Sequence, residues 1–189
     1  KCLMQHSGHP LNGFFLHDHD ALHERILALI NTGQRFILTG VTFALLDFSE
    51  RFPLQLGDRA IIVETGGMKG RRKEIVREEL HAILCERFGV DTIHSEYGMT
   101  ELLSQAWSHG DGIYHPVPWM RIRLCDLNDP FQPVEAGRSG VINVIDLANL
   151  YSCSFIATRD LGRLLPVGGF EVLGRVDHSD VRGCNLMTV

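Results

Sequence analysis

The sequence predicts an α/β fold that passes into a β-rich C-terminal lobe. Up to about residue 101, strand-like apolar runs alternate with helix-like periods, in the order strand, helix, strand, helix, strand. This order is typical of parallel strands joined by helices. From residue 113 the chain changes to short apolar or alternating runs separated by turns, which indicates a meander of strands. We therefore expect an α/β subdomain over residues 1–112 and a β-rich lobe over residues 113–189.

The first half is predicted from apolar spacing and from residues that start or stop helices. Asp18 or Asp20 can cap a first helix, and Gly33 can end it. By the same reasoning Pro53 closes the second helix and Gly89 the third. The predicted helices cover residues 18–33, 41–52 and 71–88, and the predicted strands cover 35–39, 60–64 and 90–95.

The second half is predicted to contain only strands and turns. Glycine, proline, asparagine and aspartate mark turns at residues 128–130, 137–140 and 168–169. The runs between them predict strands over residues 119–124, 141–145, 154–158 and 170–173.

Composition excludes several functional classes. The chain has 189 residues, 44% hydrophobic and 22% charged, and a net charge of −5. This charge gives no support for binding to nucleic acid, and no run of about 18 apolar residues predicts a membrane span. Five scattered cysteines without a CxxC pair argue against a disulfide framework or zinc knuckle and fit a reducing cytoplasm. Because the chain begins at Lys1 without methionine, we expect it to be a piece of a longer polypeptide.

The segment YGMTE, residues 97–101, follows a predicted strand and is the strongest candidate site. Ligands of open α/β sheets bind at the carboxyl ends of strands. Tyr97 offers a ring for a base, Gly98 a flexible link, Thr100 a hydroxyl for a phosphate, and Glu101 a carboxylate for Mg²⁺. The alternative is a polar loop without a ligand.

Three further motifs have a functional and a structural interpretation. Gly66 and Gly67 lie between a strand and a basic helix start, where backbone N–H groups bind anions; the alternative is a solvated turn. Asp160, in the turn TRDLG, suits a ribose diol or simply forms the turn. Arg175, in GRVD, suits a phosphate or ribose, or pairs with Asp177.

The order of these motifs resembles the adenylate-forming superfamily of acyl-CoA synthetases, luciferases and peptide-synthetase adenylation domains. Its Gly-Gly loop, YGxTE, GxxGxI, [ST]xDLG and GRxD motifs match residues 66–67, 97–101, 137–142, 158–162 and 174–177. The GGMK loop, the form YGMTE and the ending RGCNL are most similar to the acyl-protein synthetases of bacterial bioluminescence. Phenylacetate-CoA ligase-like enzymes are the next nearest group. The resemblance implies the C-terminal part of the large domain of such an enzyme, ending at the interdomain hinge.

The resemblance also implies an ATP- and Mg²⁺-dependent reaction of a carboxylic acid, such as a fatty acid, to acyl-AMP. The acyl group would then pass to coenzyme A, a protein thiol or another acceptor. Gly66, Gly67 and Tyr97 would line the adenine pocket, Thr100 would contact the α-phosphate and Glu101 would hold Mg²⁺. Asp160 would bind the ribose hydroxyls, and Arg175 would lie near the ribose and the hinge.

The resemblance leaves Cys184 as a candidate acyl acceptor, because the acyl-protein synthetases use a C-terminal cysteine; the alternative is an inert thiol. Cys85, Cys125 and Cys153 are interpreted as structural. A histidine cluster at positions 6, 9, 17, 19 and 23 could bind a metal, although solvated surface histidines are the favoured interpretation.

Two elements of the superfamily are missing from the sequence, the phosphate-binding loop and the lobe with the catalytic lysine. In addition, Arg159 stands where many relatives have glycine. We therefore expect the chain alone not to complete adenylation. A non-catalytic binding module that keeps the fold remains the alternative function. The oligomeric state is left undetermined.

Overall fold

The computed structural model describes residues 2–66 and 75–176, and it describes side chains from residue 5 onward. The chain divides into two compact units, Lys1–His94 and Ser95–Val189, which we describe separately. The change of pattern in the sequence suggested a boundary at residues 112 and 113 instead. The boundary lies earlier because β4 (Ala106–Ser108) and β5 (Ile113–Pro116) pair into the sheet of the second unit.

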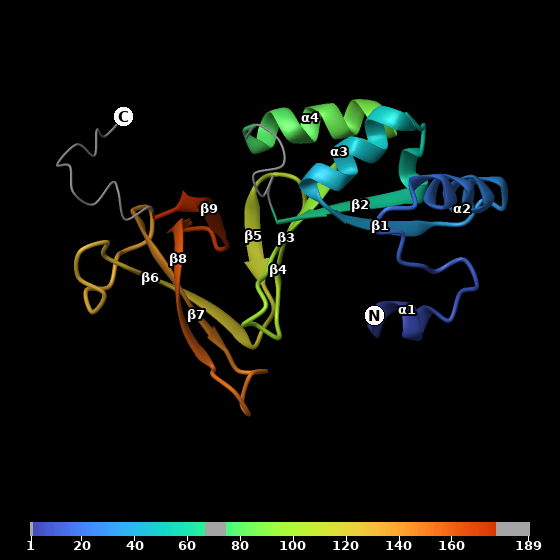
Figure 1. The fold of residues 1–189 in the computed structure, drawn as a ribbon. Coiled ribbons are helices and arrows are strands. Elements are labelled where there is room, and N and C mark those ends of the chain that lie inside the picture. Colours follow the sequence, from blue (N-terminus) through green and yellow to red (C-terminus); the bar gives the residue numbers. More distant parts are fainter. Residues whose placement is uncertain (1, 67–74, 177–189) are drawn as a thin grey trace. The chain divides into compact units, whose positions relative to one another are not determined.

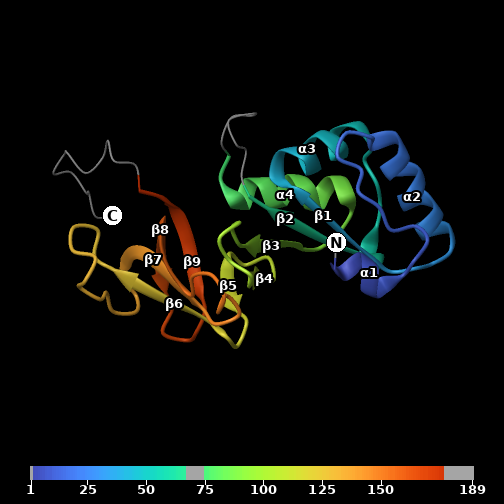
Figure 2. The same ribbon diagram turned by 60° about the horizontal axis from the view of Figure 1, so that its bottom comes forward.

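In the first unit, two parallel strands carry a helical layer on one face. β1 (Phe36–Val41) pairs with β2 (Ala60–Thr65), Phe36 lying opposite Ala60. Helices α3 (Thr42–Arg51) and α4 (Arg77–Phe88) lie together against these strands (Figures 1 and 2). The unit also contains α1 (Cys2–Ser7), α2 (His19–Asn31) and the short helix η1 (Gly57–Arg59). The helical layer therefore buries one side of the strand pair.

The core of this unit is built from the apolar stripes that the sequence predicted. Leu84 and Phe88 of α4 are fully buried, as are Phe48 of α3 and Ile62 of β2. Phe48 and Phe88 stack with ring centroids 6.2 Å apart. Burying a large apolar side chain contributes about 1.5–3 kcal/mol, so these contacts hold α3 and α4 on the strands.

Helix ends match the predicted signals except at the start of α4. The Asp18 carboxylate accepts a hydrogen bond from the Ala21 amide at 3.0 Å, which confirms the predicted cap of α2. Helix α4 was predicted from residue 71 but begins at Arg77, after Val76 in an extended conformation. Glu78 and Glu79 in its first turn favour this start, because negative charge stabilises a helix N-terminus. Residues 71–74 lie outside the described part.

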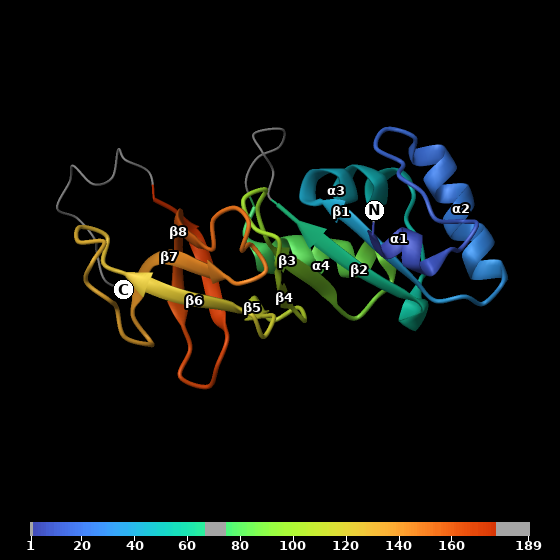
Figure 3. The same ribbon diagram turned by 90° about the horizontal axis from the view of Figure 1, so that it is seen from below.

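The second unit is an antiparallel sheet in the order β3–β4–β5–β9–β8–β7–β6. Its strands β6, β7 and β8 lie beside one another in Figure 3. β3 (Ile93–Tyr97) begins in the first unit and ends in the second. The remaining strands are β6 (Met120–Cys125), β7 (Ser139–Asp146), β8 (Phe155–Leu164) and β9 (Phe170–Arg175). Alternating residues of β6 and β7 face a core that includes Ile122, Leu124, Ile142, Val144 and Phe170.

The four predicted strands of this half are confirmed, with three differences. β8 was expected to end at residue 158 but continues to Leu164. β4 and β5 were not predicted, because three and four residues are too few to show a clear alternating pattern. Over the described ranges, no helix has both the length and the apolar character needed to cross a bilayer.

Candidate functional site

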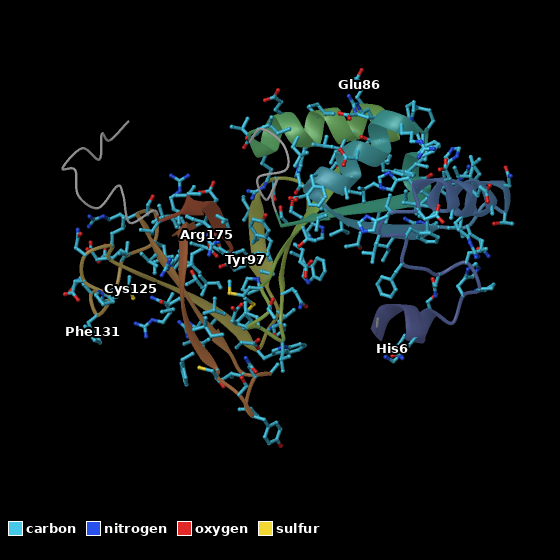
Figure 4. The ribbon with its side chains drawn as sticks, in the orientation of Figure 1. His6, Glu86, Tyr97, Cys125, Phe131 and Arg175 are labelled. Carbon is cyan, nitrogen blue, oxygen red and sulfur yellow. The ribbon has the colours of Figure 1, made fainter. Side chains whose placement is uncertain are left out.

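Three residues from three separate predicted motifs meet in the second unit. The Tyr97 hydroxyl, at the end of β3, donates a hydrogen bond to Asp160 Oδ2 at 2.9 Å. Arg175 Nε, at the end of β9, lies 3.3 Å from Asp160 Oδ1. Figure 4 shows the Tyr97 and Arg175 labels close together, away from Phe131 on the loop after β6. Each oxygen of the Asp160 carboxylate therefore has a partner, and the carboxylate is held in one orientation.

Tyr97 is buried rather than displayed on a surface. Its side chain is 7% exposed and packs edge-on against Phe170, with ring centroids 5.4 Å apart, and against Tyr114 at 6.0 Å. Burial, followed by the negative charge of Asp160, raises the pKa of Tyr97 well above its ordinary value. The hydroxyl therefore remains a donor to Asp160 throughout the physiological pH range.

Asp160 does not lie in a turn, as the sequence suggested, but within β8. Asp160 lies opposite Arg175 in the β8–β9 ladder, and a bulge between Leu161 and Gly162 shifts the register beyond that pair. Gly162 permits the close approach of the strands, because a Cβ there would lie 2.7 Å from the Glu171 carbonyl oxygen. The interpretation of Asp160 as a turn former is therefore wrong. The predicted alternative partner of Arg175, Asp177, lies outside the described residues.

Thr100 and Glu101 lie on a tight turn directly after β3. The Leu102 amide donates to the Met99 carbonyl at 3.1 Å and closes this turn. Both Thr100 and Glu101 are exposed, while Leu102 is buried and anchors the turn in the core. Among the described residues nothing bonds the Glu101 carboxylate, although its backbone carbonyl accepts from Asn149 Nδ2 at 2.8 Å. The turn thus presents a hydroxyl and a carboxylate outward from a fixed backbone.

Of the predicted Gly-Gly loop, only its first residue is described. Gly66 directly follows β2, with a positive φ of 83°, in the first unit. Gly67 and the basic residues after it lie outside the described part, and so does Cys184. Their predicted roles therefore stay predictions.

Sequence reasoning missed two buried acidic residues. Asp146, at the end of β7, is fully buried; burial favours its neutral form, but hydrogen bonds from Ser104, Leu103 and Ala148 hold its pKa below the ordinary value. Glu64, at the end of β2 and 6% exposed, accepts from the Thr42 hydroxyl at 2.9 Å. A carboxylate ending an apolar strand was the available signal in both cases, because such a group is rarely buried without partners.

The predicted histidine cluster and structural cysteines have ordinary surroundings. His23 stacks on Phe52 at 4.3 Å, and His19 meets Phe48 edge-on at 5.7 Å. No group of three or more metal-binding side chains occurs in the described ranges. Burial, then the charge of Asp91, raises the pKa of the Cys85 thiol, which keeps it protonated. Cys125 is partly buried on β6, whereas Cys153 is exposed.

The chain is similar to two curated proteins. The long-chain-fatty-acid–luciferin-component ligase of Vibrio harveyi is 26% identical over 144 residues, which are 69% of this chain and 37% of that protein. The ligase of the same name from Aliivibrio fischeri is 25% identical over 142 residues, again 69% and 37%. The chain therefore spans slightly more than a third of the length of these relatives.

Solved structures show the same fold at lower identity. ATP-bound MatB from Rhodopseudomonas palustris has a TM-score of 0.59 at 18% identity, over 81% of this chain and 33% of that one. The O-succinylbenzoate coenzyme A synthetase MenE from Bacillus subtilis, in complex with ATP and magnesium, has a TM-score of 0.55 at 22% identity, over 81% and 34%. The sequence profile of the family described as "Acyl-protein synthetase, LuxE" matches residues 9–188. The chain therefore belongs to the LuxE acyl-protein synthetase family, and its fold is that of a part of an adenylate-forming enzyme.

Proposed function

We propose that this chain carries the ribose and magnesium side of an ATP site in an enzyme that activates a carboxylic acid as acyl-AMP. The observation that supports this most strongly is the meeting of Tyr97, Asp160 and Arg175. These residues lie in three motifs that were predicted separately, and the first two are 63 positions apart. The three residues lie on β3, β8 and β9, so the folding of the sheet brings three separate motifs to one carboxylate.

Asp160 is suited to bind a ribose diol. Its carboxylate can accept hydrogen bonds from two adjacent hydroxyls, as acidic residues do in dinucleotide sites. Tyr97 and Arg175 leave lone pairs on both oxygens, because each carboxylate oxygen can accept more than one bond. The Arg175 side chain is 78% exposed, so its terminal N–H groups can reach a ribose or phosphate oxygen.

Glu101 is suited to hold Mg²⁺, and Thr100 to contact the α-phosphate. Mg²⁺ in nucleotide sites takes one or two carboxylates and completes its shell with phosphate oxygens and waters. A single exposed carboxylate on a fixed turn meets that requirement. When bound, the ion would neutralise phosphate charge that develops during the reaction.

Tyr97, with Gly66 and Gly67, is proposed to lie beside the adenine. A ring that is 7% exposed cannot receive a base over a whole face unless neighbouring groups move. Tyr97 therefore contributes mainly through its hydroxyl, which orients Asp160, and its exposed edge contacts the base.

The proposed reaction has two steps. A carboxylate oxygen attacks the α-phosphorus of ATP and pyrophosphate leaves, giving acyl-AMP; an acceptor then attacks the acyl carbon and AMP leaves. Positioning of the charged reactants supplies most of the acceleration. The names of the two curated relatives support a long-chain fatty acid as the substrate. The candidate acyl acceptors are Cys184, coenzyme A and another protein. The scattered cysteines, without a CxxC pair, support a cytoplasmic location for the protein.

The proposal is tested by ATP–pyrophosphate exchange with the full-length protein and a panel of fatty and aromatic acids. We expect exchange with at least one acid, and a loss of about 100-fold or more in Glu101→Ala, because a transition-state charge contact is removed. Glu135→Ala, which removes an exposed carboxylate elsewhere in the second unit, serves as the control and should keep full activity. No exchange with any acid would reject the enzyme, and an unaffected Glu101→Ala variant would favour a binding module without catalysis.

A further inference from the structure

A buried carboxylate outside the predicted motifs binds the chain directly after the Thr100–Glu101 turn. Asp146 Oδ2 accepts from the Leu103 and Ser104 amides, each at 2.9 Å. Its Oδ1 accepts from the Ser104 hydroxyl at 2.6 Å and from the Ala148 amide at 3.1 Å. Asp146 has no exposed surface, so these four bonds replace all of its hydration.

A second side chain from the same connection binds the turn itself. Asn149, 5% exposed, donates from Nδ2 to the Glu101 carbonyl at 2.8 Å and to the Cys153 carbonyl at 3.0 Å. The connection is internally rigid, because the Asp146 amide donates to the Ser154 carbonyl at 2.8 Å and the Asn149 amide to the Asp146 carbonyl at 3.1 Å. The bonds from Asp146 and from Asn149 therefore both come from one short, internally hydrogen-bonded connection between β7 and β8.

The bonds enclose the turn on its C-terminal side. Strand β3 fixes the chain before Gly98, and Asn149 binds the Glu101 carbonyl. Asp146 binds the Leu103 and Ser104 amides, which follow the turn. The Trp119 indole N–H adds a bond to the Ser104 hydroxyl at 2.8 Å. The Glu101 carbonyl and the Leu103 and Ser104 amides are thereby all bonded within the protein, so the backbone that supports the exposed turn is fixed in position.

We propose that Asp146 and Asn149 are positioning residues, which hold the Thr100–Glu101 turn so that its hydroxyl and carboxylate face the phosphates and metal. This inference rests on the proposed function for the identity of the ligand. Neither residue touches the ligand; both act through the backbone of residues 101–104. A displacement of about 1 Å in a catalytic group can lower the reaction rate about 100-fold. The bonds from Asp146 and Asn149 to the backbone therefore matter for catalysis.

Two substitutions keep the size of the side chain but exchange hydrogen-bond donors and acceptors, so they test the polarity of the network without changing its packing. Asp146→Asn keeps one acceptor oxygen but turns an N–H₂ group toward the other two donors. Asn149→Asp replaces the group that donates to the Glu101 and Cys153 carbonyls with an acceptor. Asp111→Asn is the matched control, because Asp111 also accepts from a serine hydroxyl and a backbone amide, at 3.1 and 3.0 Å, but in the β4–β5 turn.

The first readout is the dependence of ATP–pyrophosphate exchange on Mg²⁺ concentration in the full-length protein. We expect both substitutions to lower kcat at least tenfold and to raise the half-saturating Mg²⁺ concentration, with the KM for the acid unchanged. Asp111→Asn should match the wild type. Asp146→Asn and Asn149→Asp variants that also match the wild type in kcat and Mg²⁺ dependence would overturn the inference.

The second readout needs no activity and therefore separates this inference from the proposed function. Amide hydrogen exchange at Leu102 reports closure of the turn onto Met99, and this amide does not bond to Asp146 or Asn149. We expect its exchange to accelerate at least tenfold in both variants, relative to Asp111→Asn, under conditions where all remain folded by circular dichroism. If the wild type proves inactive with every acid, the proposed function fails, and unchanged Leu102 exchange would still overturn the positioning role.

Discussion

Replacing Tyr97 by phenylalanine removes one oxygen atom and leaves the ring packing in place. The lost bond joins a hydroxyl to a carboxylate over 2.9 Å, and the Asp160 side chain is only 15% exposed. Hydrogen bonds to charged groups contribute about 1.5–3 kcal/mol. Because Arg175 stays beside the other oxygen and water can reach part of the carboxylate, we expect a loss of about 1–2 kcal/mol in unfolding free energy.

Thermal unfolding followed by circular dichroism measures this loss. For a unit of 60–100 residues, each kcal/mol lowers the melting temperature by about 4–8 °C. Looser Asp160 orientation should also weaken binding of Mg²⁺-ATP about tenfold, which corresponds to about 1.4 kcal/mol and is measured by titration calorimetry. Tyr151→Phe is the control, because Tyr151 is fully exposed and its hydroxyl has no partner among the described residues. A Tyr97→Phe variant that melts and binds like this control would refute the reasoning.

Three further predictions concern ionisation, strand packing and the acyl acceptor. Because burial and Asp160 raise the pKa of Tyr97 above its ordinary 10.0, unfolding free energy should fall as pH rises above 10; absorbance titration should show late tyrosine ionisation that Tyr97→Phe reduces by one group. Gly162→Ala should destabilise the second unit by about 1–3 kcal/mol in denaturant titration, since its Cβ would meet the Glu171 carbonyl at 2.7 Å, and an unchanged midpoint would contradict the described bulge. After incubation with ATP and the acid, mass spectrometry should find a thioester that Cys184→Ser abolishes; acyl groups elsewhere in the wild type would exclude Cys184.

Patterns with local causes were predicted well from the sequence. Apolar spacing located α2, α3, α4 and most strands, since periodicity reflects which face is buried, but it did not locate the short helix α1. The start of α4 was misplaced by six residues because Ile75 and the charged run before it continue the helical pattern, whereas Val76 adopts an extended conformation. Asp160 was assigned to a turn because its neighbours, Gly162 among them, are common in turns; only pairing with β9 shows that the glycine serves a bulge.

Contacts between distant segments could not be predicted in the same way. The motif residues Tyr97, Asp160 and Arg175 were chosen individually, but the hydrogen bond and the ion pair that join them depend on how β3, β8 and β9 fold together. Asp146 was missed because three of its four bonds come from backbone amides, two of them more than 40 positions earlier, and every residue type except proline can supply a backbone amide. The roles of Thr100 and Glu101 in binding remain predictions.

The bulge between β8 and β9 changes the pairing register by one residue between the two ends of this strand pair. On one side of it Gly162 lies opposite Val172, and on the other Asp160 lies opposite Arg175, so β9 contributes one extra residue. In a regular ladder that paired every residue of β9, Asp160 would lie opposite Gly174, and Arg175 would project from the other face of the sheet. The core-forming part of β9 and its site-forming part are thus in different registers. Deleting Leu173 would therefore make the ladder continuous and keep Arg175 opposite Asp160, with the Phe170 end of the strand in place.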